Sequence, residues 1–217
     1  LGVVATPTVG VMIGARQAQG GVVITASHNP AQWNGLKLLD EFGTAPSPDL
    51  AAEVIKVFCS DHQVEAAQTP GDIEIDVRAT DTHVSKVLGA IDPMPLRERG
   101  FRVVLDSVHG AGVAGGAAVL GHLGCDLTHL GEQADGDFQH TPEPTAENLT
   151  ELCKAVLTAG ADIGCAQDPD ADRLALVDEH GRYIGEEYTL VLAAWRVLLE
   201  NPSATLVTNL STSRMID

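Results

Sequence analysis

Residues 101–112 read FRVVLDSVHGAG, an apolar run that ends in a glycine-rich turn, and this stretch decides the fold. The run predicts a buried strand over Phe101–Asp106, and helical periodicity follows over Gly112–Leu123. The alternation continues with a strand at Cys125–Leu130, a helix at Ala146–Gly160 and a strand at Asp162–Ala166. Strands that alternate with helices are typical of α/β proteins with parallel sheet, so this segment is predicted to form one doubly wound unit.

The same alternation extends to both sides of this unit. Further strands are predicted at Gly21–Thr25, Leu36–Leu39, Leu174–Asp178 and Thr205–Asn209, and further helices at Pro48–Cys59, Thr82–Ala90 and Glu186–Leu199. Residues 174–184 carry a turn signal in their middle and are predicted to form a hairpin. We therefore expect an α/β fold with mainly parallel mixed sheets and flanking helices.

Two domain boundaries are predicted from composition. One lies in the proline-containing residues 92–100, and the other lies near Gly185, after the hairpin. They divide the chain into residues 1–96, 97–185 and 186–217. The chain opens without a methionine in an apolar stretch and ends in a predicted helix start. We therefore expect it to be incomplete, a piece of a longer protein.

The charge of the chain limits its partners. Thirteen basic and thirty acidic side chains give a formal net charge of −17 over 217 residues. Such a charge repels nucleic acid and anionic lipid headgroups, so neither nucleic acid nor a membrane is expected as a partner. A small anionic substrate is still compatible, because a few cationic groups or a bound divalent cation can reverse the sign inside one cleft.

The four cysteines and the hydropathy of the chain indicate a cytoplasmic protein. The cysteines show no CxxC pairing, which favours buried thiols in a reducing compartment over a zinc site. The sequence contains neither a signal peptide nor an apolar run of the roughly 18 to 20 residues that a membrane span needs.

A serine motif follows the first predicted strand. Residues 25–30 read TASHNP, so Ser27 lies just beyond the carboxyl end of that strand, where α/β proteins build their sites. Taken alone, this motif is better explained as a plain turn, because serine, asparagine and proline dominate loops. Adjacent Ser27 and His28 do not by themselves make a hydrolase pair, because such pairs are defined by geometry.

An aspartate motif follows a later strand. Residues 168–173 read DPDADR and place three carboxylates at alternate positions, Asp168, Asp170 and Asp172. Carboxylates so close together repel one another unless a cation holds them, and hard oxygen ligands favour Mg²⁺, Ca²⁺ or Mn²⁺. An EF-hand loop is excluded because Arg173 stands where that loop needs glycine. A solvated acidic turn remains the alternative on this motif alone.

Together with NGLK at residues 34–37, the two motifs resemble those of the α-D-phosphohexomutase superfamily, which includes phosphoglucomutase/phosphomannomutase and phosphoglucosamine mutase. The resemblance extends to residues 103–112 and 135–149, and thus spans nearly the whole chain. It implies repeated domains, of which this chain holds the end of the first with the serine loop, all of the second with the metal loop, and the beginning of the third. The resemblance leads us to expect that the rest of the third domain and the fourth domain lie outside this chain.

The resemblance also assigns roles to residues. It implies that Ser27 is carried as a phosphoserine and, with Asp168, Asp170 and Asp172, contributes to binding one Mg²⁺. Arg173 is implied to bind substrate. Lys37 is implied to be a general acid/base, supported by His28. Without the resemblance, Lys37 is better explained as a surface lysine at a strand edge.

The activity implied is reversible isomerisation of a hexose or hexosamine 1-phosphate to the 6-phosphate through a bisphosphorylated sugar. Residues 32–39, QWNGLKLL, resemble phosphoglucosamine mutases more than phosphomannomutases, so we favour a hexosamine substrate and keep the phosphomannomutase/phosphoglucomutase reaction as the alternative. A non-catalytic metal-binding fragment and a phosphatase, in which water attacks the phosphoserine, are two further alternatives. The chain alone is expected to be inactive, and its oligomeric state is undetermined.

The chain departs from the family at Pro169, where the metal loop usually carries glycine. Proline fixes φ near −65° and removes one N–H donor. We expect the carboxylate positions to survive this change.

Overall fold

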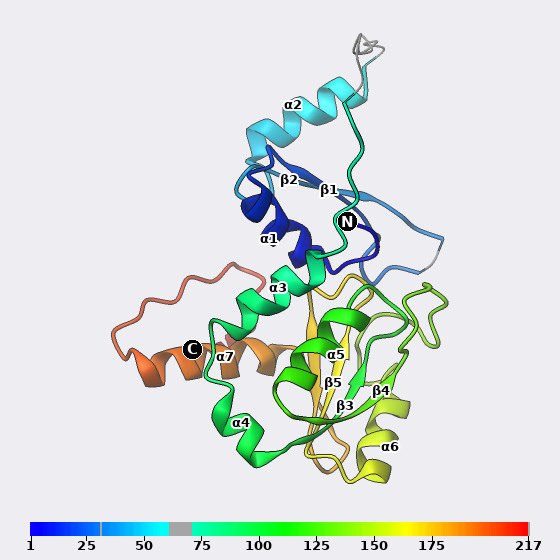
Figure 1. The fold of residues 1–217 in the computed structure, drawn as a ribbon, viewed down its shortest axis with the longest axis vertical. Helices are drawn as coiled ribbons and strands as arrows, with labels where there is room; N and C mark the ends of the chain where they lie inside the picture. The colour runs from blue at the N-terminus through cyan, green and yellow to red at the C-terminus, as the bar shows by residue number, and fades with distance from the viewer. Residues whose placement is uncertain (31, 61–70, 217) are drawn as a thin grey trace.

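The computed structural model describes residues 1–30, 32–60 and 71–216. Figure 1 shows two bodies that meet near α3 (Ala79–Leu88), with the C-terminal segment at one side. The upper body contains α1 (Thr6–Arg16), β1 (Gly21–Ile24), β2 (Leu36–Leu39) and α2 (Pro48–Phe58). Strands β1 and β2 pair antiparallel, with Val23 opposite Lys37.

The lower body is built on a five-stranded mixed sheet. Its strands are β3 (Arg102–Asp106), β4 (Asp126–Leu130), β5 (Ile163–Gln167), β6 (Leu174–Val177) and β7 (Tyr183–Gly185), in the order β4-β3-β5-β6-β7. Strand β3 is parallel to both β4 and β5, and β6 is antiparallel to both of its neighbours. The parallel half corresponds to the predicted doubly wound unit, and the antiparallel half corresponds to the predicted hairpin.

Helices α5 (Val113–His122) and α6 (Thr150–Ala159) lie on opposite faces of this sheet. The connection from β3 through α5 to β4 and the return from β4 through α6 to β5 run in opposite directions, and right-handed crossovers then place the two helices on opposite faces. Alternate strand residues accordingly face different helices: Val104 and Ala166 pack in the core with α6, whereas Leu105 and Cys165 line an apolar cavity beside α5.

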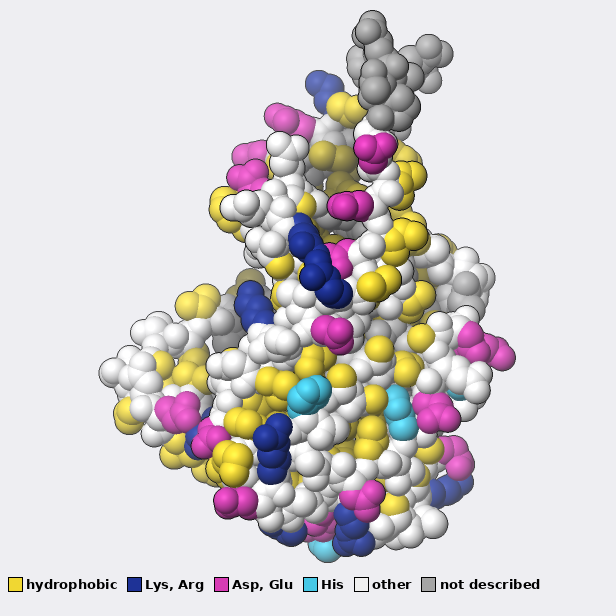
Figure 2. Space-filling model, viewed as in Figure 1, with side chains coloured by type: hydrophobic (Ala, Val, Ile, Leu, Met, Phe, Trp, Pro, Cys, Tyr) yellow, Lys and Arg dark blue, Asp and Glu magenta, His cyan; other side chains and the backbone are white. Residues whose placement is uncertain are grey.

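Helix α3 joins the two bodies, since it packs against both α1 and α5. At the α1 contact, the Thr8 hydroxyl and His83 Nδ1 are hydrogen-bonded at 2.9 Å. The short helix α4 (Met94–Arg99) follows, and the chain closes with α7 (Glu187–Glu200) and a 3₁₀ turn at Arg214–Ile216. Figure 2 shows the face of the molecule that is seen in Figure 1. Hydrophobic side chains gather in the middle of this view, and charged side chains surround them.

The expected α/β class with a mixed sheet and flanking helices is confirmed, but several details differ. The sheets are not mainly parallel: among the described residues two strand pairings are parallel and three are antiparallel, because the hairpin adds to one edge of the larger sheet and β1 pairs only with β2. Helix α1 was not predicted, because Gly10 and Gly14 interrupt its apolar pattern. The strand predicted at Thr205–Asn209 is wrong: these residues have no regular structure, and Val207 is exposed. A strand needs a pairing partner, and this segment has none among the described residues.

The structure also shows the state of the cysteines and whether a helix could span a membrane. All four cysteines are free, but the prediction that they are buried is wrong. Cys59 is exposed because it caps the exposed end of α2, and Cys125, Cys153 and Cys165 are only partly buried. Among the described residues, no helix is both long and apolar enough to span a bilayer.

Candidate functional site

The aspartate loop lies at the carboxyl edge of the parallel strands. Residues 168–173 follow β5 directly, and residues 107–112 follow its neighbour β3, so both loops emerge at the same edge of the sheet. The two loops are fastened together, because the Ala111 N–H donates to the Pro169 carbonyl at 2.7 Å. A Cβ on Gly110 would lie 2.5 Å from that carbonyl oxygen, so this contact requires glycine at position 110.

The aspartate loop folds around its first carboxylate. Asp168 Oδ1 accepts hydrogen bonds from the backbone N–H groups of Asp172 (3.1 Å) and Arg173 (3.0 Å), and the Asp168 side chain is fully buried. The left-handed backbone conformation that the turn needs falls at Ala171, with φ 52°, and not at Pro169. Proline is therefore tolerated at position 169, and the carboxylates of Asp168, Asp170 and Asp172 lie within 4.8 Å of one another.

The serine loop reaches this site from the upper body. Ser27 also has a left-handed backbone, with φ 52°, and its N–H donates to the Thr25 hydroxyl at 2.9 Å. Such a conformation is uncommon for a residue with a side chain, and residues that adopt it are enriched at functional sites. The Ser27 hydroxyl donates to Asp168 Oδ2 at 3.0 Å and lies 3.2 Å from His28 Nδ1.

Lys37 also points into the site. It lies on β2, and its Nζ donates to Asp170 Oδ2 at 2.6 Å and to Asp172 Oδ2 at 2.8 Å. Its side chain is 36% exposed, but the ammonium group is engaged by two carboxylates of the other body. The alternative of a plain surface lysine therefore does not describe its environment.

The Arg173 side chain lies between the aspartate loop and Glu186. Its Nε donates to Asp168 Oδ2 at 3.3 Å, and its Nη1 approaches Glu186 Oε2 at 3.5 Å. The remaining nitrogen, Nη2, is buried without a hydrogen-bond partner. A buried guanidinium nitrogen with no partner is costly, so it is suited to an anionic oxygen of a ligand.

The electrostatics follow from burial and from these ion pairs. Burial raises the pKa of Asp168, and the charges of Asp170 and Asp172 add to this effect. Burial also acts to raise the pKa of Asp170, but hydrogen bonds from Lys37 and Thr6 outweigh it and lower the pKa. Burial opposes the charge of Lys37, but its two carboxylate partners raise its pKa.

The three aspartates supply the hard oxygen ligands that a divalent cation needs. Their carboxylates face only two cationic side chains among the described residues, Lys37 and Arg173, so the group retains negative charge. Asp170 Oδ1 is buried and has no hydrogen-bond partner. Leaving a buried carboxylate oxygen unpaired is unfavourable unless a cation approaches it. These carboxylate ligands are the kind that Mg²⁺ prefers.

Comparison with known proteins identifies the family to which the chain belongs. The sequence models of the phosphoglucomutase/phosphomannomutase family match it in two parts, α/β/α domain I over residues 1–65 and α/β/α domain II over residues 81–181. The chain belongs to this family, within the α-D-phosphohexomutase superfamily. The predicted resemblance is thereby confirmed.

Curated relatives cover the whole chain. A probable phosphoglucosamine mutase from Methanopyrus kandleri is 35% identical over 100% of this chain and 48% of its own length. A phosphoglucomutase/phosphomannomutase from Thermococcus kodakarensis is 36% identical over 100% of this chain and 48% of its own length. The chain therefore spans about half the length of the curated family members it matches.

A solved structure of the family has the same fold. The crystal structure of a putative phosphomannomutase from Thermus thermophilus superposes with a TM-score of 0.79 and 25% identity, covering 91% of this chain and 45% of that one. A phosphoglucomutase/phosphomannomutase family protein from Burkholderia thailandensis gives a TM-score of 0.74 and 28% identity, with 93% and 44% covered.

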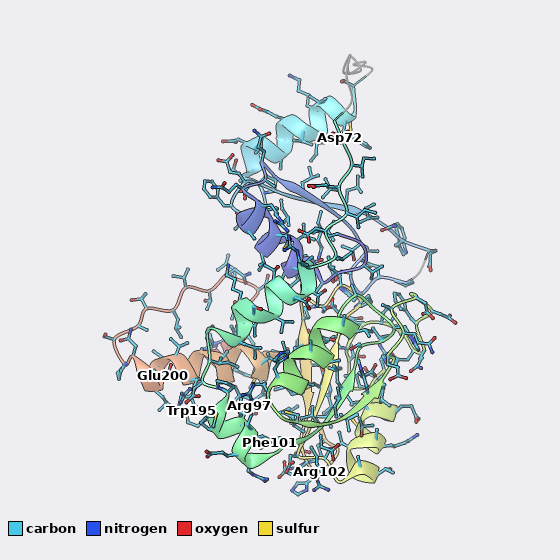
Figure 3. The ribbon with its side chains drawn as sticks, viewed as in Figure 1. Asp72, Arg97, Phe101, Arg102, Trp195 and Glu200 are labelled. Atoms are coloured by element: carbon cyan, nitrogen blue, oxygen red, sulfur yellow. The ribbon has the colours of Figure 1, made fainter. Side chains whose placement is uncertain are left out.

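Two residues at the site of this family member were missed by sequence reasoning. Thr6 begins α1 and donates its hydroxyl to Asp170 Oδ2 at 2.7 Å, and Glu186 lies beside Arg173. The Thr6-Pro7 pair carried a signal for Thr6, because proline in the first turn is typical of a helix start. Figure 3 shows by contrast that Arg97, Phe101 and Arg102 lie at the far end of the lower body from the junction.

Proposed function

We propose that this chain is part of a phosphohexomutase that interconverts the 1-phosphate and 6-phosphate of a hexose or hexosamine through a phosphoserine at Ser27. One observation carries the proposal: the Ser27 hydroxyl of the upper body lies 3.0 Å from Asp168 of the lower body's aspartate loop. A hydroxyl is thereby held beside a cation site, which is what phosphoryl transfer to and from serine requires. Residues 1–96, 97–185 and 186–217 are proposed as the end of its first domain, all of its second and the beginning of its third, although the match to domain II begins earlier, at residue 81.

The proposed reaction proceeds in two transfers. Phosphorylated Ser27 gives its phosphoryl group to the free hydroxyl of a sugar monophosphate, so that the bond from phosphorus to Ser27 Oγ breaks and a bond to the sugar oxygen forms. The sugar hydroxyl loses its proton as this bond forms, and the departing Ser27 Oγ takes up a proton to become a hydroxyl. Lys37 is the proposed acid/base for this exchange, with His28 beside the serine in support. The bisphosphorylated sugar then reorients, and its other phosphate returns to Ser27.

The remaining site residues are proposed to position the substrate and to balance the charge of its phosphate groups. Asp168, Asp170 and Asp172 are proposed to hold one Mg²⁺ with the phosphorylated Ser27, and Mg²⁺ when bound offsets the charge of the transferring group. Arg173 is proposed to bind a substrate phosphate, since one of its buried nitrogens lacks a partner. An open hollow beside Ser27, lined by Asn29, Trp33, Asn34 and Lys37, offers room for the sugar.

A hexosamine is the proposed sugar. The segment around Trp33 and Lys37 supports this choice, and several relatives are named probable phosphoglucosamine mutase. The alternative is a hexose, because another relative at similar identity is named phosphoglucomutase/phosphomannomutase.

A coupled assay of the complete protein tests this function. We expect turnover of glucosamine phosphate with a higher kcat/KM than glucose or mannose phosphates, and loss of turnover in Ser27→Ala. Ser85→Ala, which alters an exposed serine on α3, is the matched control. Release of inorganic phosphate without sugar isomerisation would instead support a phosphatase, and the absence of both would support a non-catalytic metal-binding module.

A further inference from the structure

We infer that Thr6 is a positioning residue that orients the Asp170 carboxylate toward the bound cation. The inference rests on the metal site of the proposed function and extends it to a residue of a different body. In the described contacts Thr6 does not bond to the reacting serine, and its bonds in the site go to Asp170. It acts through Asp170, which lies 164 residues later in the chain.

Two hydrogen bonds tie Thr6 to Asp170. The Thr6 hydroxyl donates to Asp170 Oδ2 at 2.7 Å, and the Thr6 backbone N–H donates to the Asp170 carbonyl at 2.8 Å. The first bond restricts rotation of the carboxylate, and the second fixes the backbone that carries it. Thr6 therefore holds both the carboxylate and the backbone carbonyl of Asp170.

The arrangement divides the two oxygens of Asp170 between different tasks. Oδ2 accepts from Thr6 and from Lys37, whereas Oδ1 is buried and has no partner among the described residues. A carboxylate that could rotate freely would bring either oxygen to a donor. With Oδ2 held, Oδ1 is the oxygen left for the cation.

Thr6 is better suited than Lys37 to hold this orientation permanently. Lys37 reaches Asp170 on a long, flexible side chain that also contacts Asp172 and is the proposed proton carrier. Thr6 has a short branched side chain at the first position of α1, and the positive end of that helix favours a carboxylate beside it. Loss of its hydroxyl should therefore affect the metal site even while Lys37 remains.

The simpler reading is that Thr6 only fastens the two bodies together. Thr8, two residues later on α1, provides the matched comparison, because its hydroxyl also joins α1 to another element but bonds to His83 rather than to the aspartate loop. Thr6→Val and Thr8→Val each replace a hydroxyl by a methyl group. Thr6→Ser retains the hydroxyl and should preserve the bond to Asp170.

The experiment is a titration of the complete protein with Mg²⁺ by calorimetry, and with Mn²⁺ by electron paramagnetic resonance. No sugar is added, and intact mass establishes that all variants have the same phosphorylation state. We expect Thr6→Val to weaken metal binding roughly 10- to 100-fold, as is usual for residues that orient metal ligands. Thr6→Ser and Thr8→Val should bind within about threefold of wild type.

Wild-type affinity in a folded Thr6→Val protein would overturn the inference, as would an equal loss in Thr8→Val. If Thr6→Val does not fold, Thr6→Ala removes the same hydroxyl with less bulk, and its affinity decides in the same way. Asp170→Asn separates this inference from the proposed function. If wild type and Asp170→Asn bind metal equally well, the metal site itself is wrong, whatever Thr6 does.

Discussion

Ser27 and Asp168 lie 141 residues apart in sequence, and the Ser27 hydroxyl donates a 3.0 Å hydrogen bond to the buried Asp168 carboxylate. This bond joins the loop after β1 to the loop after β5, and Lys37 makes parallel contacts to Asp170 and Asp172. The site thus exists only where the two bodies meet. Changes to either loop, or to the contacts that fasten them, are expected to alter chemistry or metal binding.

Ser27→Ala is expected to abolish phosphorylation of the protein by a sugar bisphosphate, because the acceptor oxygen is removed. Intact mass measures this directly as the loss of the roughly 80 Da that one phosphoryl group adds. Ser85→Ala should be labelled like wild type. Full labelling of Ser27→Ala would assign the acceptor to another residue.

Lys37→Met is expected to slow turnover of the complete enzyme by roughly 10²-fold or more, the usual scale for losing a positioned acid or base. Lys86→Met, which changes an exposed lysine in the last turn of α3, serves as the control and should leave the rate unchanged. Steady-state kinetics with saturating sugar phosphate provide the measurement. Equal rates in Lys37→Met and wild type would return Lys37 to the role of a surface lysine.

Gly110→Ala is expected to displace the aspartate loop, because the new Cβ would lie 2.5 Å from the Pro169 carbonyl oxygen. Both groups are backbone-borne, so the strain cannot be relieved by a side-chain rotation. We expect a loss of roughly 1 to 3 kcal/mol in the free energy of unfolding, the usual range for overpacking, together with weaker Mg²⁺ binding. Denaturant unfolding and calorimetry measure the two effects.

Gly121→Ala is the matched control for that change. It lies in α5, where an added Cβ meets nothing within 4 Å. Alanine there should stabilise the helix by roughly 0.5 to 1 kcal/mol. If Gly110→Ala were as stable as Gly121→Ala and bound Mg²⁺ normally, the close contact with Pro169 would have no consequence.

His140→Gln is expected to change the pH dependence of stability. The hydrogen bond from His140 Nε2 to Asp106 Oδ2, 3.0 Å, raises the pKa of His140 in the folded protein despite burial. Its stabilising contribution is therefore fully present below the ordinary histidine pKa of about 6.5 and is lost as pH rises through the folded pKa. The difference in unfolding free energy between wild type and His140→Gln should be larger at about pH 5.5 than at about pH 9. The same difference at both pH values would contradict this account.

Local patterns predicted much of the fold and the chemical groups of the site. The alternation of apolar strands with amphipathic helices over residues 101–166 predicted the parallel half of the sheet, because period and polarity are local properties of the chain. The trio Asp168, Asp170 and Asp172 was visible for the same reason, since one short loop carries all three carboxylates. Helix α1 was missed because its glycines blur that pattern.

The sequence by itself determined the α/β class, the position of Ser27 beyond a strand end, and a cluster of carboxylates suited to a hard cation. Only the tertiary structure decided that Ser27, Lys37 and Thr6 meet those carboxylates, and that Asp170 Oδ1 is the oxygen left unpaired. The physical reason is that these contacts join residues more than a hundred positions apart, and their geometry depends on how two bodies pack around α3. No local period in the chain encodes a distance of that kind.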